Sequence, residues 1–318
     1  MVRRWEILQG DVRETLRALP EKTVQTCVTS PPYFGLRDYG VDGQIGLEPT
    51  PAEYVEQMVQ VFREVRRVLR DDGTLWLNLG DSYARTGGTD KNITSTGKVG
   101  DTLKTLDMLP DRKQRAPNGL KDKDLIGIPW RVAFALQQDG WYLRQDIIWH
   151  KPNPMPESVR DRCTKAHEYV FLLSKSERYY WDVEAMQEPA VGGTSRGNGQ
   201  RLAERAIART GGVISGGTAK STLGTSADET RNRRSVWTVA TRPYKGAHFA
   251  PFPPALIEPC ILAGAPFNGL VLDPFTGSGT TAAVALQHGR RFIGCELNPD
   301  YIKLAEARIA AAEAEVLW

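Results

Sequence analysis

Apolar and polar positions divide most of the chain into two kinds of segment. Short apolar runs of strand length, such as 24–28 and 269–273, precede or follow longer segments with helical spacing of their apolar residues. The segment 54–69 shows this spacing most clearly, and its apolar stripe is predicted to face the core: Val55, Met58, Val59, Phe62, Val65 and Leu69. The alternation of strands and helices predicts an α/β fold with a mostly parallel sheet.

Three glycines stand where a helical segment gives way to a strand. They are Gly73, Gly140 and Gly289. Glycine commonly ends a helix because it adopts the left-handed conformation without steric cost. We therefore predict a helix end at each of the three.

Two segments depart from the alternation and are predicted to be insertions. Residues 84–124 are polar, rich in Gly and Thr and mixed in charge, which favours a long surface excursion. Residues 190–235 carry eight Arg and Lys against three acids, a surplus of five in a chain whose net charge is +3. Such a segment suits contact with the phosphates of a nucleic acid, and composition alone equally allows a solvated linker.

Composition places the chain among cytoplasmic globular proteins. It has 318 residues, of which 41% are hydrophobic and 25% charged, enough to bury a large core. Its apolar runs are too short to span a membrane, and the basic N-terminus lacks the apolar stretch of a signal peptide. Four widely spaced cysteines match neither a zinc site nor a disulfide framework, and we expect buried or half-buried thiols: Cys27, Cys163, Cys260 and Cys295.

The stretch "GLVLDPFTGSGTTAAVA" has the outline of a ligand-binding loop. A buried strand ends at Asp273, a turn with Gly277 and Gly279 follows, and a helix begins near Thr280. The sequence Gly-Lys-Ser/Thr of triphosphate sites is missing, and the dinucleotide fingerprint is incomplete. A second strand ends in Glu296 about twenty residues further on, where a carboxylate accepts from both hydroxyls of a ribose. The pattern favours a ligand with a ribose and without phosphates, or a simple tight connection.

The stretch "TCVTSPPYFGL" ends a buried strand in a stiff corner. Ser30, Pro31, Pro32 and Tyr33 follow the strand, and no acid, base or thiol nearby has the look of a catalytic group. Each proline fixes its own φ and restricts the residue before it, so the carbonyl groups here are held in place. Taken alone, the motif is also compatible with a Pro-Pro turn and a packed tyrosine.

Together these motifs resemble the S-adenosylmethionine-dependent DNA amino-methyltransferases. "TSPPY" is similar to the catalytic motif of that family, and "DPFTGSGTT" and "FIGCELNPDYI" are similar to its cofactor motifs. The catalytic motif precedes the cofactor loop, as in the circularly permuted beta class. The resemblance implies a Rossmann-like methyltransferase fold and S-adenosyl-L-methionine as cofactor.

The resemblance also gives the corner a chemical role. An exocyclic amine of a nucleobase is a poor nucleophile because its lone pair is delocalised into the ring. Rigid acceptors that bind the amine hydrogens direct this lone pair toward the methyl group, and Ser30 Oγ with the carbonyls of Ser30 and Pro31 are implied as these acceptors. Tyr33 is implied to stack on a base that has been flipped out of the duplex.

Further roles carry over position by position to the cofactor side. Asp11 is implied to accept from the adenine amino group, although its position suits a helix N-cap equally well. Asp273 is implied to lie near the methionine amino group, Phe275 against the adenosine and Glu296 at the ribose. Gly277 and Gly279 are expected to let the backbone approach the cofactor. Thr280 or Thr281 is expected to bind the cofactor carboxylate.

The implied partner is double-stranded DNA. Lys151 and three arginines of the basic insert, Arg231, Arg233 and Arg234, are expected to contact phosphates. No stretch is long enough for a nuclease, so a cognate restriction endonuclease would be a separate chain. The sequence allows a monomer or a homodimer.

The expected organisation has three parts. Residues 1–189 form the catalytic half with its insert 84–124, residues 190–235 form the target-recognition insert, and residues 236–318 form the cofactor-binding half. Ser at the first position of the corner and "HFAPFP" resemble the cytosine-N4 group of the family, which predicts methylation of the 4-amino group of cytosine. The 6-amino group of adenine is the alternative, followed by an RNA or protein methyltransferase and by a non-catalytic DNA-binding module.

Overall fold

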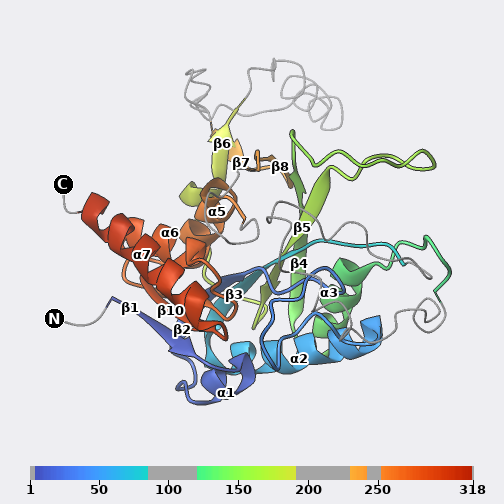
Figure 1. Ribbon diagram of the computed structural model, residues 1–318. Coiled ribbons are helices and arrows are strands. Elements are labelled where there is room, and N and C mark those ends of the chain that lie inside the picture. The colour runs from blue at the N-terminus through green and yellow to red at the C-terminus, as the bar shows by residue number, and fades with distance from the viewer. Residues whose placement is uncertain (1–3, 85–119, 191–229, 242–251, 317–318) are drawn as a thin grey trace, which may run out of the picture. The chain divides into compact units, whose positions relative to one another are not determined.

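The structure is a computed structural model that describes residues 4–84, 120–190, 230–241 and 252–316 (Figure 1). It divides into two compact units. One unit contains the chain up to Asp182 together with the chain from Ser235 onward, and the other spans Val183–Arg234. Most of both predicted insertions lies outside the described residues.

The first unit is built on an eight-stranded sheet in the order β1-β10-β9-β2-β3-β5-β4-β8. The strands are β1 (Trp5–Gln9), β2 (Val24–Thr29), β3 (Leu69–Leu79), β4 (Tyr142–His150), β5 (His167–Ser174), β8 (Val236–Thr238), β9 (Leu270–Asp273) and β10 (Arg291–Glu296). In this spatial order, each strand from β1 through β10, β9 and β2 to β3 is parallel to the next, and β4 is parallel to β8. Only β5 runs antiparallel to the strands beside it, so the predicted mostly parallel α/β sheet is confirmed.

Helices cover the sheet in two rows. α1 (Val12–Arg17), α2 (Pro51–Val68) and α3 (Ile128–Gln138) contact one another in sequence order, as do α5 (Pro254–Gly264), α6 (Thr280–Gln287) and α7 (Pro299–Val316). Figure 1 shows the two rows on opposite sides of the sheet. Every residue of β2 is buried as a result, including the polar Gln25, Thr26 and Thr29, in agreement with the buried strand predicted there.

The sheet order brings the two ends of the chain together. β2, from the early part of the sequence, lies beside β9 from the late part, with Thr26 opposite Val271 and Cys27 opposite Leu272. β1 pairs with β10, so the first strand lies on the cofactor-binding side although the sequence analysis assigned residues 1–189 to the catalytic half. The carboxyl ends of β2, β9 and β10 therefore meet at one edge of the sheet.

The stripe on α2 is rotated from the predicted one. The buried positions of the helix are Pro51, Tyr54, Met58, Val61, Phe62, Val65 and Val68, whereas Val55 and Val59 are half-buried. The ring of Tyr54 lies entirely in the core, and this aromatic residue was left out of the apolar pattern. An aromatic ring with one polar atom buries well when its hydroxyl finds a partner.

One of the three predicted helix ends is wrong. α2 ends at Val68 and the chain passes directly into β3, which contains Gly73. A Cβ at this glycine would lie 3.1 Å from the Gln25 carbonyl oxygen, so the residue permits a close approach of two strands. Gly140 and Gly289 follow α3 and α6 with φ of 97° and 72°, as predicted for helix ends.

The cysteines and the ends of the first insertion are also placed by the structure. Cys163 is exposed, contrary to prediction, while the other three cysteines are buried. The ends of the first insertion pair with each other, Ala84 N donating to Asp124 O at 2.8 Å.

In the second unit, η3 (Glu184–Met186) leads into β6 (Gln187–Pro189), which runs antiparallel to β7 (Thr230–Asn232). Within the described ranges, no helix is both long and apolar enough to cross a membrane.

Candidate functional site: a pocket beside the Ser-Pro-Pro-Tyr corner

Two turns meet at the edge of the sheet, because the strands that precede them are neighbours. The Gly-rich turn follows β9 and the Ser-Pro-Pro-Tyr corner follows β2. Ser30 and Pro32 of the corner line the same pocket as Phe275 and Gly277 of the turn. In open α/β sheets, ligands bind at such a crevice outside the carboxyl ends of the strands.

Glu296, at the end of β10, connects the Gly-rich turn after β9 to the turn that follows β10. Its Oε2 accepts from Gly277 N and its Oε1 from Asn298 N, both at 2.8 Å. Burial raises the pKa of this carboxyl, and the two backbone donors oppose that effect. Each carboxylate oxygen has a second acceptor position, so Glu296, which lines the pocket, is able to accept further hydrogen bonds from a ligand.

Asp273 lies beneath the pocket and does not line it, in contrast to the expected contact with the cofactor. Its side chain is 2% exposed. Oδ1 accepts from Thr29 Oγ1 at 2.7 Å and from Phe275 N at 3.0 Å, and Oδ2 accepts from Thr281 Oγ1 at 2.6 Å. Burial raises the pKa of Asp273 to about 6. The residue ties β2, the turn and α6 together, so its place in the structure is that of an internal support.

The start of α6 also differs from expectation. Gly279 has φ of 77°, and a Cβ there would lie 2.8 Å from Ala305 Cβ, so it allows α6 to pack closely on α7. Thr280 Oγ1 accepts from Arg308, and Thr281 donates to Asp273. All three residues are buried and none of them lines the pocket. The threonines therefore do not present their hydroxyls to a ligand carboxylate there.

Asp11 combines both roles that the sequence allowed for its position. It is the N-cap of α1, accepting from Arg13 N at 2.8 Å, and it also lines the pocket. The guanidinium of Arg13 binds the same carboxylate, and this contact holds the pKa of Asp11 below its ordinary value. The carboxylate is thus fixed and ionised at the pocket wall.

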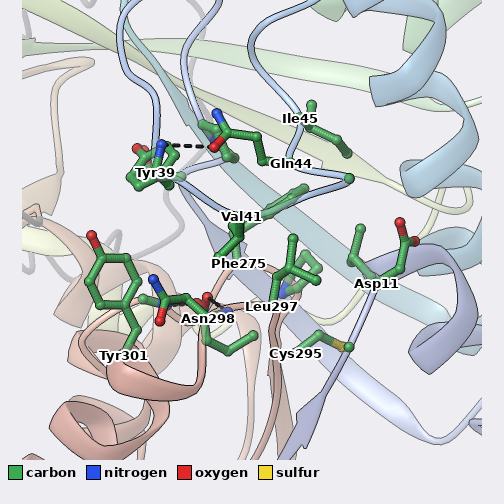
Figure 2. Close-up of a pocket in the computed structure, with 18 residues that line it drawn as sticks. Asp11, Tyr39, Val41, Gln44, Ile45, Phe275, Cys295, Leu297, Asn298 and Tyr301 are labelled. Carbon is green, nitrogen blue, oxygen red and sulfur yellow. Dashed lines mark hydrogen bonds between the residues drawn. The ribbon is translucent and has the colours of Figure 1, made fainter. Parts of the chain in front are cut away.

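The opposite wall comes from a loop that the sequence analysis did not single out. Figure 2 shows Tyr39, Val41, Gln44 and Ile45 of this loop facing the side that carries Phe275. The loop is braced internally, Tyr39 N donating to Gln44 Oε1 at 2.8 Å. Glycines at positions 40, 43 and 46, all with positive φ, were the available signal for a tightly folded loop.

Residues after Glu296 complete the pocket. Leu297, Asn298 and Tyr301 all line it, and the Tyr301 ring meets Tyr39 edge-on with centroids 6.3 Å apart (Figure 2). These residues belong to "ELNPDYI", which the sequence analysis associated with the cofactor without assigning a role beyond Glu296. The two tyrosines connect the loop to α7.

The pocket suits an adenosine-containing ligand without phosphates. Carboxylates, backbone groups and aromatic rings line it, and among the described lining residues there is no Lys, Arg or His. Acids accept from ribose hydroxyls and an adenine amine, whereas phosphate sites need cations or a cluster of N–H donors. These acceptors and aromatic rings therefore fit S-adenosyl-L-methionine, and Glu296, Asp11 and Phe275 are the lining residues that would hold it.

The Ser-Pro-Pro-Tyr corner is fixed from outside its own sequence. Tyr54 of α2 donates its hydroxyl hydrogen to Pro32 O at 2.8 Å. A Cβ at Gly46 would lie 3.2 Å from Tyr33 O, so the loop packs directly on the corner. The next residue, Phe34, is buried against Tyr54 with ring centroids 5.7 Å apart.

Tyr33 directs its hydroxyl toward β3 and β5. The hydroxyl oxygen lies 2.8 Å from Glu168 Oε2, 3.2 Å from Asn78 Oδ1 and 3.4 Å from Ser30 Oγ. Glu168 and Asn78 come from strands far away in the sequence, and no local pattern indicated either of them. Burial, followed by the negative charge of Glu168, raises the pKa of Tyr33 well above its ordinary value, so the hydroxyl stays protonated.

Lys151 belongs to the same cluster, which argues against its predicted contact with DNA phosphate. Its side chain is 18% exposed and its ammonium pairs with Glu168 Oε1. The ammonium also lies 4.3 Å from the centroid of the Trp149 ring. A half-buried ammonium with an acid and an aromatic face as partners is satisfied within the protein.

The three predicted DNA-binding arginines lie at the end of the second unit. Arg231 and Arg234 both donate to Glu188 Oε1, at 3.0 and 2.8 Å. Arg233 N donates to Met186 O at 2.8 Å. One acid therefore offsets part of the positive charge of this group.

Comparison with known proteins places this arrangement in a family. A family model for N6 and N4 methyltransferases, described as DNA methylase, matches residues 24–307. The chain is 46% identical over 311 residues to the type II methyltransferase M.XycI of Xanthomonas campestris pv. cyanopsidis, covering 98% of this chain and 89% of the relative. It is also 46% identical over 310 residues to the type II methyltransferase M.SmaI of Serratia marcescens, covering 97% and 91%.

Solved structures share the fold. The PvuII DNA methyltransferase, described as cytosine-N4-specific, gives a TM-score of 0.61 at 19% identity, over 99% of this chain and 93% of that one. A putative DNA modification methylase from Thermus thermophilus, complexed with S-adenosyl-L-methionine, gives 0.56 at 23% identity, over 96% and 95%. The family model and the relatives extend over most of the sequence, and this chain belongs to the S-adenosylmethionine-dependent DNA amino-methyltransferases.

Proposed function

We propose that the protein methylates the 4-amino group of cytosine in double-stranded DNA, flipping the base into the corner. One observation carries the proposal: Ser30 of the corner lines the same pocket as Glu296 and Phe275. A base held at Ser30 is thereby next to the site that fits the cofactor. When bound, S-adenosyl-L-methionine supplies an electrophilic methyl group.

The corner contributes by positioning the amine. Ser30 Oγ and the carbonyls of Ser30 and Pro31 accept hydrogen bonds from it, which localises the lone pair on nitrogen. Tyr54 and Gly46 hold the corner in place, so these acceptors need no reorganisation when the base arrives. The ring of Tyr33 offers a face for the base.

Serine is the feature that favours cytosine. Within the family that the sequence resembles, Ser at the place of Ser30 is typical of enzymes that act on cytosine, and Asp is typical of those that act on adenine. A hydroxyl both donates and accepts, whereas a carboxylate only accepts. Adenine, which presents the same edge of amine and ring nitrogen, is the second candidate.

The relatives named above are type II methyltransferases, and we propose that this protein likewise protects DNA against a separate restriction endonuclease. Arg231, Arg233 and Arg234 are proposed to contact DNA phosphates, and the segment 190–235 to carry target recognition.

Mass spectrometry of digested DNA from cells that express the protein tests the proposal. We expect N4-methylcytosine, and much less of it from cells that express a Ser30→Ala variant at the same level. Methylated adenine without N4-methylcytosine would assign the enzyme to adenine. Sequencing the same DNA identifies the target site.

A further inference from the structure

A polar cluster lies behind the corner and is connected to Ser30 through a single side chain. Tyr33 Oη is within hydrogen-bonding distance of Ser30 Oγ, Asn78 Oδ1 and Glu168 Oε2. Glu168 is in turn paired with Lys151. Starting from the pocket, the order of contacts is Ser30, Tyr33, Glu168 and Lys151.

Hydrogen counting gives these bonds a direction. Tyr33 has one hydroxyl hydrogen, and Glu168 is its better acceptor because the oxygens are 2.8 Å apart and the carboxylate is charged. The Tyr33 oxygen then accepts from the Ser30 hydroxyl at 3.4 Å. Such bonds commonly tighten when substrate binds. With its hydrogen directed at Tyr33, Ser30 presents its lone pairs toward the pocket.

The far end of this series of contacts is held rigidly. Glu168 is 16% exposed, and its second oxygen binds Lys151. Asn78 Nδ2 donates to Glu168 Oε2 at 3.4 Å and to Tyr169 O at 3.0 Å. A Cβ at Gly80 would lie 2.5 Å from Tyr33 Cε2, so the tyrosine ring rests on bare backbone. The carboxylate and the ring therefore have little freedom to separate.

We propose that Glu168, held by Lys151, is the terminal proton acceptor of a relay that runs from the target amine through Ser30 and Tyr33. The inference rests on the proposed function, since it requires an amine at Ser30. Glu168 acts through Tyr33 and is a positioning residue for Ser30 as well as the end of the relay.

The amine nitrogen forms a bond to the methyl carbon while the carbon–sulfur bond breaks and leaves its electron pair on sulfur. The nitrogen, now positively charged, gives a proton to Ser30 Oγ. The Ser30 hydroxyl proton passes to Tyr33 Oη and the Tyr33 proton to Glu168 Oε2, which ends as a neutral acid and later loses its proton to water.

The neighbouring groups leave the glutamate as the acceptor within this cluster. Asn78 is an uncharged amide and Lys151 is a cation, so neither takes up a proton. A half-buried tyrosine with a raised pKa passes a proton on more readily than it keeps a negative charge. A serine hydroxyl is too weakly basic to retain the extra proton.

Glu168→Gln and Tyr33→Phe, alone and combined, test the relay. Each single change is expected to lower the single-turnover methylation rate by about 10²-fold, the contribution typical of a positioned acid or base. Cofactor affinity, measured by calorimetry, is expected to stay within about threefold of wild type because neither side chain lines the pocket. The double variant is expected to be no slower than the slower single variant.

A matched control is Glu64→Gln on α2. It neutralises a half-buried acid that is 23% exposed and is paired with Arg67. Its rate is expected to equal that of wild type. The solvent deuterium isotope effect on the single-turnover rate gives a separate readout: it is expected in wild type and in the control, and lost in Tyr33→Phe.

The outcomes separate this inference from the proposed function. A Glu168→Gln rate close to wild type, or a double variant whose losses multiply, would overturn the relay. If thermal melting shows that Glu168→Gln is unfolded, Tyr33→Phe decides, and an unchanged isotope effect in it refutes the relay. Wild-type protein that methylates adenine overturns the proposed base alone, because the relay is then measured on that amine. Methylation of neither base overturns both.

Discussion

The cofactor pocket and the catalytic corner lie at one edge of the same sheet, yet different kinds of contact hold them. In the pocket, Glu296 is fixed by backbone N–H groups 19 and 2 residues away. At the corner, the Tyr33 hydroxyl lies within hydrogen-bonding distance of side chains 45 and 135 residues away. The difference teaches that cofactor affinity and methyl transfer depend on separate sets of bonds, and that substitutions should separate them.

The largest effect is expected at the corner. Ser30→Ala and Tyr33→Ala should lower methyl transfer by about 10²- to 10³-fold, because each removes a preorganised contact with the amine or base. Cofactor affinity by calorimetry should remain within about threefold of wild type. A collapse of affinity together with activity would show that the two regions are not separable.

The support beneath the pocket is tested by pH. The pKa of Asp273 is about 6 in the folded protein against an ordinary 3.8, so the folded state binds this proton more tightly than the unfolded state. The resulting stabilisation is complete below about pH 4 and is lost as pH rises through 6. Relative to Asp273→Asn, wild type should lose up to about 3 kcal/mol of unfolding free energy between pH 4 and 7.

Asn is a suitable replacement at this position. Its carbonyl accepts from Thr29 and Phe275, and the Thr281 hydroxyl is able to donate to Val28 O, 3.4 Å away, while accepting from the new amide. Denaturant unfolding of both proteins at several pH values measures the difference. Parallel stability curves would contradict the raised pKa.

Glu296 provides the converse of the corner substitutions. Glu296→Ala removes the acceptor at the pocket wall and frees Gly277 N and Asn298 N, so cofactor affinity should fall by about 10- to 100-fold. The rate at saturating cofactor should change much less. Glu306→Ala, an exposed acid on α7, is the control and should bind as wild type. Unaltered affinity in Glu296→Ala would mean that the cofactor binds elsewhere.

The smallest effect is expected in the second unit. Reversing the charges of Arg231, Arg233 and Arg234 should weaken DNA binding and flatten its dependence on salt, because fewer counterions are released. The change should be modest since Glu188 already offsets part of the charge.

The control for this experiment reverses Lys22, Arg70 and Lys303. These are exposed cations of the first unit, and each is also paired with an acid. A salt titration of DNA binding compares the two triple variants. Equal slopes would show that the arginines do not face phosphate.

Local patterns were sufficient for the elements and for part of the site. The continuous apolar runs predicted buried strands, and the glycines at 140 and 289 predicted helix ends, because both signals depend on neighbouring residues alone. Ser30, Phe275 and Glu296 stand at or just after strand ends and line one pocket, since parallel neighbours bring their carboxyl ends together. The helix end predicted at Gly73 was wrong because glycine also occurs where two strands pack closely.

Tertiary structure alone decided what each polar side chain contacts. Asp273, Thr280 and Thr281 stand at positions that suit a ligand, yet Thr281 bonds to Asp273 and Thr280 to Arg308 of α7 inside the protein. Lys151 pairs with Glu168 because antiparallel β4 and β5 bring the two together at one edge. Sequence determines which residues are apolar and where the chain turns, whereas a polar group selects its partner by distance across the sheet, and that distance exists only once the strands have assembled.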